Sequence, residues 1–224
     1  NGPLRILFED SNWLAINKPA GLTSVPGPSN RNDTAVNRIK GYLLRSGSKN
    51  LRPHLITRLD SFTSGVVLVA KHRLANNLAN QIRGEHRIKK TYLAVVSGCL
   101  ERDHGSIKMP IGKLPNEIRR HRMSNGKPAW TEYWVLRQDP KFTVVRVRLH
   151  TGRTHQIRVH FAEVGHPVVG DHLYGGPLNL GIHRQALHAS RIQMPNPFTR
   201  HRLDITAKLP SDVLKLISGA SINE

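Results

Sequence analysis

One aspartate, Asp60, has the residue type and the neighbours that covalent chemistry requires. It lies in residues 58–65, RLDSFTSG, where three hydroxyl side chains and a glycine follow it within five positions. A carboxylate that is held ionised and aimed at an electrophilic carbon acts as a nucleophile, and it also serves as a general base. The local residues equally fit a turn carboxylate that caps a backbone amide, since aspartate is common in such turns. Taken alone, the segment favours the turn.

A second dense motif lies far downstream, at residues 152–160, GRTHQIRVH. Thr154 suits a helix N-cap, and Ile157, Phe161 and Val164 would form the inward stripe of that helix. Arg158 then becomes the candidate partner of Asp60, because a guanidinium holds a carboxylate through two parallel hydrogen bonds and keeps it ionised. The competing interpretation is a solvated arginine that contacts phosphate, and spacing alone does not bring Arg158 to Asp60.

Two further side chains suit contact with a nucleobase. Arg58 precedes Asp60 by two positions, and its planar head would stack in the space left by an extruded base. Tyr92 follows two lysines in KKTY, and its ring would stack on a base if it faced a ligand. The plainer alternatives are a surface cation for Arg58 and core packing, with the hydroxyl at an edge, for Tyr92.

A metal site is not expected. His150, His155 and His160 are five residues apart, which does not place them on one helix face, and no carboxylate triad accompanies them. Cys99 is the single cysteine, so there is no intramolecular disulfide and no cysteine-based zinc cluster. P-loop, dinucleotide and Gly-x-Ser-x-Gly motifs are all missing, which disfavours nucleotide-driven and hydrolase functions.

The charge of the chain points to a polyanionic partner. The 224 residues include 34 Lys+Arg against 15 Asp+Glu, a formal net charge of +19. A phosphate backbone fits that excess better than a membrane, since no basic amphipathic helix stands out and no apolar run approaches the roughly 20 residues that span a bilayer. Only 5% of the residues are aromatic, which argues against a single-strand reader built on rows of stacking rings. No signal peptide is visible, and an intracellular location is expected.

The hydrophobic pattern mixes strands and helices without regular alternation. This favours an α+β fold with a mixed, largely antiparallel central sheet, flanked by helices and loops around a basic cleft. Polar and basic residues 101–128 are expected to form a long exposed loop or hairpin. The expected strands are residues 4–8, 13–17, 66–70, 91–96, 130–136 and 142–149. Four helices are expected: one that begins near Asp33-Thr34, one with an apolar stripe of Leu74, Leu78 and Ile82, one that begins at Thr154, and a short C-terminal one around Val213, Leu214 and Ile217.

Several separated segments, in order, resemble the RluA-type RNA pseudouridine synthases. Residues 57–65, TRLDSFTSG, are similar to the family signature His-Arg-Leu-Asp-x-x-Thr-Ser-Gly. The agreement continues through most of the chain, in residues 10–21 (ending NKPAG), 90–98 (KTYLAVVSG), 151–160, 165–171 (GHPVVGD), 174–175 (YG), 187–189 (LHA) and Pro197. An ordered set of motifs is far more specific than any one of them.

The resemblance implies an isomerase that converts uridine in RNA to pseudouridine without cofactor or metal. It implies that Asp60 is the catalytic nucleophile, that Tyr92 packs on the target base and that Arg158 is the salt-bridge partner of Asp60. Arg58 and Arg153 are expected to contact RNA, with Arg58 filling the gap left in the RNA stack. The expected partner is rRNA or tRNA. Residues 1–224 are expected to form a single catalytic domain, without an S4-type domain. The protein is expected to be a monomer in the cytoplasm.

The sequence departs from the family pattern next to the aspartate. Thr57 stands where the family usually has histidine, and Ser61-Phe62 replaces a pair that is often charged. These differences leave open a catalytically inactive RNA-binding or ribosome-assembly protein that keeps the fold. A metal-free nuclease using the three histidines is a third, weaker alternative.

Overall fold

A computed structural model describes residues 2–28 and 30–219. The chain forms two compact units, each assembled from separated stretches of sequence. The first unit contains the described residues up to Lys89 together with Ala189–Lys208, and the second contains Lys90–His188 together with those from Leu209 onward. The single catalytic domain expected over residues 1–224 stays a prediction.

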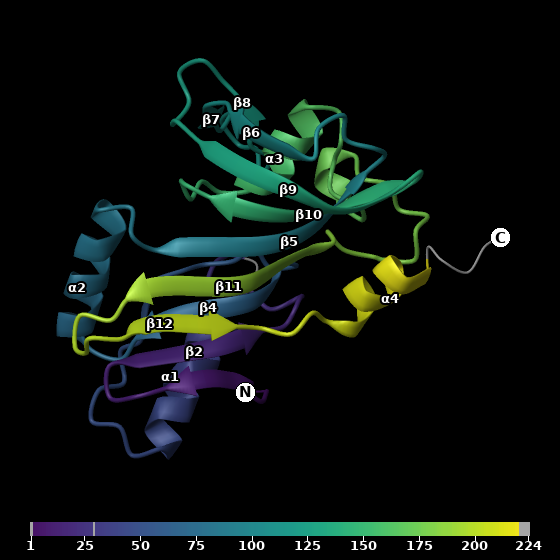
Figure 1. Cartoon of the computed structure of the whole chain (residues 1–224). Helices are drawn as coiled ribbons and strands as arrows, with labels where there is room; N and C mark the ends of the chain where they lie inside the picture. Colours follow the sequence, from purple (N-terminus) through teal and green to yellow (C-terminus); the bar gives the residue numbers. More distant parts are fainter. Residues whose placement is uncertain (1, 29, 220–224) are drawn as a thin grey trace. The chain divides into compact units, whose positions relative to one another are not determined.

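Strands of the first unit form a sheet around a buried central strand. Its order is β1-β2-β4-β11, with β3 paired to β4 and β12 paired to β11 (Figure 1). The β1·β2, β2·β4, β3·β4 and β11·β12 pairings are all antiparallel. The strands are β1 (Ile6–Glu9), β2 (Trp13–Lys18), β3 (His54–Leu55), β4 (Ser64–Ala70), β11 (Leu187–Pro195), of which the residues from Ala189 belong here, and β12 (Arg202–Thr206).

Two helices complete the first unit, α1 (Ala35–Arg45) and α2 (Arg73–Gly84). Helix α1 begins where the sequence predicted, because Thr34 and the Asn37 side chain form a reciprocal capping box. The predicted stripe of α2 was partly wrong: Leu74 is exposed, and Ala75, Ala79 and Ile82 are the buried positions. Small alanines let the helix approach the sheet closely, and a pattern based on large apolar residues overlooks them.

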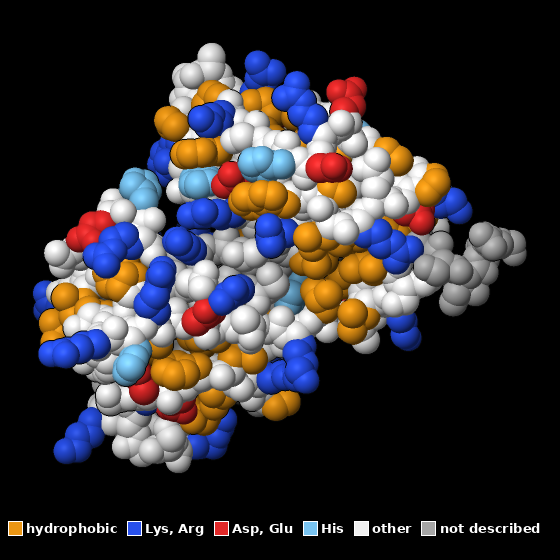
Figure 2. All heavy atoms as spheres, in the orientation of Figure 1, with side chains coloured by type: hydrophobic (Ala, Val, Ile, Leu, Met, Phe, Trp, Pro, Cys, Tyr) orange, Lys and Arg blue, Asp and Glu red, His pale blue; other side chains and the backbone are white. Residues whose placement is uncertain are grey.

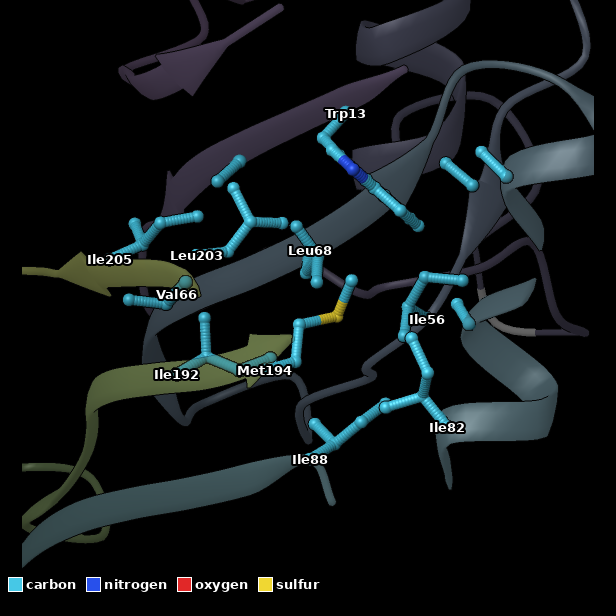
Figure 3. Close-up of a cluster of buried hydrophobic side chains, with 14 of the residues drawn as sticks. Trp13, Ile56, Val66, Leu68, Ile82, Ile88, Ile192, Met194, Leu203 and Ile205 are labelled. Carbon is cyan, nitrogen blue, oxygen red and sulfur yellow. The ribbon is translucent and has the colours of Figure 1, made fainter. Parts of the chain in front are cut away.

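The core of the first unit lies between the sheet and α2 (Figure 3). Every residue of β4 is buried, as expected for its continuous β-branched run. Trp13 is fully buried, and its indole N–H donates to the Asn196 side-chain oxygen over 3.2 Å. Strand β4, which follows the Asp60 loop, is therefore covered on both faces.

The second unit contains antiparallel strands in the order β5-β10-β9-β6, and a small β7·β8 pair (Figure 1). Its elements are β5 (Lys89–Ser97), of which the residues from Lys90 belong here, β6 (His104–Lys108), β7 (Ile111–Gly112), β8 (His121–Arg122), β9 (Trp130–Asp139), β10 (Phe142–Leu149), α3 (Gln156–Glu163), the 3-10 helix η1 (His172–Tyr174) and α4 (Ser211–Gly219).

The segment predicted as an exposed loop or hairpin, 101–128, contains the regular edge strand β6. Its composition conceals the strand, because Ile107 is its one buried side chain. Gly105 is needed there: a Cβ at this position would lie 2.4 Å from the Tyr133 hydroxyl oxygen. Tyr133 therefore lies across the strand, and the pairing with β9 rests on a contact that the sequence pattern does not show.

Both units combine helices with largely antiparallel strands, so the predicted α+β class is confirmed. Within residues 2–28 and 30–219, no helix is both long and apolar enough to cross a bilayer.

Candidate active site

Asp60 lies in the first unit, in the loop between β3 and β4. The loop turns tightly, since the Thr63 backbone N–H donates to the Asp60 carbonyl over 3.1 Å. Asp60 is half-buried, while the preceding Leu59 is buried. The Ser24 hydroxyl donates to the Leu59 carbonyl over 2.6 Å and accepts from the Leu59 N–H over 3.1 Å. The backbone beside the aspartate is therefore fixed from both sides.

A buried lysine holds the same loop. Lys18 ends β2, opposite Gly65, and is fully buried. Its ammonium donates to the carbonyls of Pro19, Leu22 and Ser61 at 2.9, 2.6 and 2.8 Å. An ammonium has three donors, and each of them has a carbonyl acceptor here. Lys18 thereby ties the NKPAG segment to the residue that follows Asp60.

We expect Lys18→Met to destabilise the protein by about 3 kcal/mol, because three carbonyls lose a charged donor, and the bond to Leu22 is buried while the other two are partly buried. That cost lowers Tm by roughly 6–12 °C for a chain of this size. Thermal unfolding against Lys40→Met, which removes an exposed lysine from α1, provides the comparison. Equal Tm values for the two variants would show that the Lys18 ammonium does not support the loop.

Thr57, which replaces the family's usual histidine, has a defined structural role. Its hydroxyl accepts a hydrogen bond from the Leu68 backbone N–H over 3.0 Å, and its own N–H donates to the Leu68 carbonyl over 3.3 Å. The threonine thus fastens the start of the Asp60 loop to β4. The substitution keeps the loop anchored, so it is no evidence for a collapsed site.

Gly65, at the other end of the loop, cannot carry a side chain. Its φ is 117°, and a Cβ there would lie 2.2 Å from the carbonyl oxygen of Ala189. Both the backbone conformation and the close approach of β11 require glycine. The Thr-Ser-Gly part of the motif therefore sets the backbone path from the Asp60 loop into the central strand, β4.

Arg58 and Phe62 flank Asp60 and are both exposed, Phe62 by 54%. An exposed guanidinium two residues from the carboxylate suits contact with a phosphate or an unstacked base. Its RNA-binding role stays a prediction.

Tyr92 lies in the second unit, on β5, and is buried, with 8% of its surface exposed. It is in register with Val147 of β10, and Val147 is also in register with Tyr133 of β9. Tyr133 contacts the ring of Phe161 in α3 at 5.5 Å between centroids. Tyr92 therefore lies on the face of the sheet that α3 covers.

Arg158, on α3, is buried and forms a two-pronged salt bridge with the buried Asp171. Its Nε and Nη2 atoms donate to the two carboxylate oxygens over 2.6 and 2.8 Å. The guanidinium also lies 4.9 Å from the centroid of the Tyr174 ring. The sequence did not suggest Asp171 as a partner, although it belongs to the GHPVVGD segment. Pairing of Arg158 with Asp60 remains a prediction beside this observed bridge.

The predicted N-cap at Thr154 was wrong. His155 occupies the cap in a left-handed conformation, φ 58°, and makes no side-chain capping bond. The Gln156 side chain secures the turn instead: its oxygen accepts from Arg153 N–H and Thr151 Oγ1, and its amide donates to the Trp130 carbonyl and Thr131 Oγ1. A glutamine after the cap gives no standard capping signal. Arg153 itself is exposed, so it can still contact RNA as predicted.

The three histidines act separately. His150 bonds Glu132, His155 bonds the Tyr174 hydroxyl, and His160 bonds Thr131 and Met109. Among residues 2–28 and 30–219, no group of three His, Cys, Asp or Glu side chains is placed to hold a metal ion.

We expect His160 to make the stability of the protein depend on pH. Burial lowers its pKa, partly opposed by the hydrogen bond to the Met109 carbonyl. The folded state then resists protonation, so its stability is complete above the ordinary histidine pKa of about 6.5 and declines as the pH falls below it. We expect His160→Gln, which cannot titrate, to have a flatter Tm profile from neutral to mildly acidic pH. Parallel Tm profiles for the wild-type protein and His160→Gln would show that His160 does not cause the pH dependence.

Comparison with known proteins identifies the family of this chain. Residues 12–163 match the RNA pseudouridylate synthase family. The chain belongs to this family. Its members are isomerases that convert uridine in RNA to pseudouridine. The chain is 39% identical to the uncharacterised RNA pseudouridine synthase YjbO of Bacillus subtilis, over 97% of this chain and 76% of that protein. It is 40% identical to ribosomal large subunit pseudouridine synthase D of Nitrosomonas europaea, over 97% and 65%.

Solved structures show the same fold. Human RNA pseudouridylate synthase domain containing 4 superposes with a TM-score of 0.80 at 23% identity, covering 97% of this chain and 93% of that one. Human RNA pseudouridylate synthase domain containing 1 gives 0.71 at 26% identity, covering 99% and 96%. The identification of the family from its ordered motifs is confirmed.

Within this pseudouridine synthase, the predicted site residues divide between the two units. Asp60 and Arg58 belong to the first unit, and Tyr92, Arg153 and Arg158 to the second. Tyr92 lies on the side of the second unit's sheet that Phe161 of α3 packs against. The residues missed from the sequence are Lys18 and Asp171, which position the Asp60 loop and Arg158.

Proposed function

We propose that this pseudouridine synthase modifies specific uridines in structured rRNA or tRNA, with Asp60 as the nucleophile. The observation that carries the proposal is the support around Asp60. Lys18, Ser24 and Thr57 each hold the backbone of its loop, so the carboxylate is presented on a rigid element. Preorganisation of this kind is what a catalytic group requires and an incidental turn does not.

The reaction proceeds without any co-reactant. The bond from ribose to the uracil nitrogen breaks, a bond from ribose to a ring carbon forms, and the proton on that carbon moves to the nitrogen. A carboxylate that attacks the substrate, leaves again, and carries the proton from the ring carbon to the nitrogen accounts for every bond and proton. The target nucleotide must leave its stack before it can react, and unpaired or loop nucleotides cost the least to extrude.

The other predicted residues have roles that fit this reaction. Arg58 occupies the space of the extruded base, Tyr92 packs against the target ring, and Arg158 keeps Asp60 ionised while Asp171 fixes the guanidinium. Arg153, exposed before α3, contacts the phosphate backbone, and the charge of +19 supplies affinity for RNA. A cytoplasmic, monomeric enzyme without metal or cofactor completes the proposal.

Reaction of the purified protein with unmodified rRNA and tRNA transcripts tests the function. We expect chemical labelling of pseudouridine to appear at one or a few defined uridines in the loops of one RNA class. Intact transcripts without any pseudouridine, despite binding, would favour the alternative of a fold-retaining RNA-binding or assembly protein. Cleaved transcripts would instead favour a nuclease.

A further inference from the structure

One face of the second unit's sheet is exposed and aromatic. Strand alternation directs Thr131 and Tyr133 of β9 toward α3, where they contact His160 and Phe161. Trp130 and Trp134 therefore point to the opposite face. We call this the tryptophan face; it consists of the even-numbered positions in residues 104–108, 130–134 and 146–150, which lie in register across β6, β9 and the end of β10.

Each tryptophan on this face contacts a histidine and a cation. Trp130 stacks on His150 with centroids 3.8 Å apart, and Lys108 Nζ lies 4.4 Å from its ring. Its indole N–H donates to the Ser106 hydroxyl over 2.6 Å. Trp134 stacks on His104 at 5.0 Å.

The second cation is Arg146, which lies 4.9 Å from the Trp134 ring. The same arrangement of indole, imidazole and cation thus occurs twice on one sheet face, two rows apart.

The charge of the tryptophan face is strongly positive. Lys108, Arg146 and Arg148 lie on it, and Glu132 is its one carboxylate. Glu132 accepts from His104 and His150 over 3.1 and 2.8 Å, so two imidazoles engage its charge. In Figure 2, histidine, cationic and hydrophobic side chains gather over the region of β9.

Strand β10 and the residue after it present these groups in a row. Arg146, Arg148 and His150 are two residues apart, which spaces their Cα atoms by about 6.7 Å along the strand. An extended backbone with one negative charge per repeat is the partner that such a row fits, and the adjacent rings suit bases. A protein partner would need several acidic groups spaced in the same way.

We propose that the tryptophan face is a second RNA-binding surface, which takes an unpaired segment of the substrate RNA away from the target uridine. The proposal rests on the proposed function only in that RNA is the substrate. Phosphates contact Lys108, Arg146 and Arg148, and bases pack on the indole and imidazole rings. Tyr92 lies on the opposite face of this sheet, so RNA held here is not the nucleotide being isomerised.

Intrinsic fluorescence reports on this surface directly. The chain has three tryptophans, and Trp13 is fully buried in the first unit. We expect a stem-loop RNA with single-stranded flanks to quench the emission of the wild-type protein. Trp130→Phe/Trp134→Phe, which leaves only Trp13, should lose that response. Anisotropy of the same RNA, labelled, measures binding independently.

A charge variant gives the second readout. Arg146→Gln/Arg148→Gln should reduce the slope of log affinity against log salt by about 1.4, at roughly 0.7 per phosphate contact on a single strand. Arg200→Gln/Arg202→Gln is the matched control, because these two exposed arginines are also two residues apart. The control should keep the wild-type slope or lose clearly less.

The outcomes separate this surface from the catalytic proposal. RNA that binds by anisotropy without changing Trp130 and Trp134 emission, or equal salt slopes for the two arginine pairs, would overturn the surface. So would concentration-dependent self-association that the Trp130→Phe/Trp134→Phe variant abolishes, since a second copy would then occupy the face. Pseudouridine formation by Asp60→Asn would overturn the catalytic role of Asp60 and leave the fluorescence result standing.

Discussion

Asp60→Asn is expected to lower pseudouridine formation by at least about three orders of magnitude, as removal of a catalytic nucleophile does in other enzymes. Asparagine keeps the size of the side chain but cannot form or release the covalent bond to the substrate. The backbone bonds that Lys18, Ser24 and Thr57 make to the loop do not involve the Asp60 carboxylate, so the loop should persist. Single-turnover assays at saturating enzyme measure the effect.

Two controls make this result specific. RNA affinity should stay within about twofold of wild type, since one carboxylate adds little to binding by a chain of charge +19. Asp103→Asn removes an exposed carboxylate just before β6 and should leave the rate unchanged. Turnover by Asp60→Asn at the wild-type rate would mean that another group performs the chemistry.

Arg158→Met is expected to abolish most activity and to destabilise the protein. Loss of one partner from a buried ion pair leaves the Asp171 carboxylate uncompensated, which costs about 3–5 kcal/mol. Tm should fall by roughly 6–20 °C as a result. A phosphate-binding arginine would instead weaken affinity and flatten the salt slope by about one. Arg158 is 7% exposed, which disfavours that role.

Asp171→Asn separates the two functions of Arg158. It weakens the same bridge but retains the guanidinium, so an Arg158 that also supports Asp60 predicts a larger rate loss for Arg158→Met than for Asp171→Asn. Rates are compared well below the Tm of each variant, with the folded fraction checked by circular dichroism. Equal rate losses would assign Arg158 to the Asp171 bridge alone.

The sequence was informative where backbone conformation, burial or helix capping restricts the choice of residue. Gly65 is an example: φ and the approach of Ala189 allow only glycine, so it appears in a recognisable motif. Strand β4 was likewise predictable, because burial on both faces leaves a continuous apolar run. The capping box of α1 depends on two residues three apart, which is a local signal.

Long-range contacts were not predictable in the same way. A lysine is normally exposed, and Lys18 is buried only because two loops bring three carbonyls to its ammonium. Asp171 pairs with Arg158 from a loop that has no periodic pattern. Composition was also misleading. The low aromatic content argued against rows of stacking rings, but strand pairing places Trp130 and Trp134 together with two histidines on one face.

The most direct test of the account is pseudouridine mapping of total cellular RNA from a strain that lacks the gene, complemented with either the wild-type or the Asp60→Asn protein. We predict that deletion removes pseudouridine from one or more defined uridines of rRNA or tRNA, that the wild-type protein restores them, and that Asp60→Asn, present at the same level, restores none. An unchanged map after deletion, or full restoration by Asp60→Asn, would contradict it.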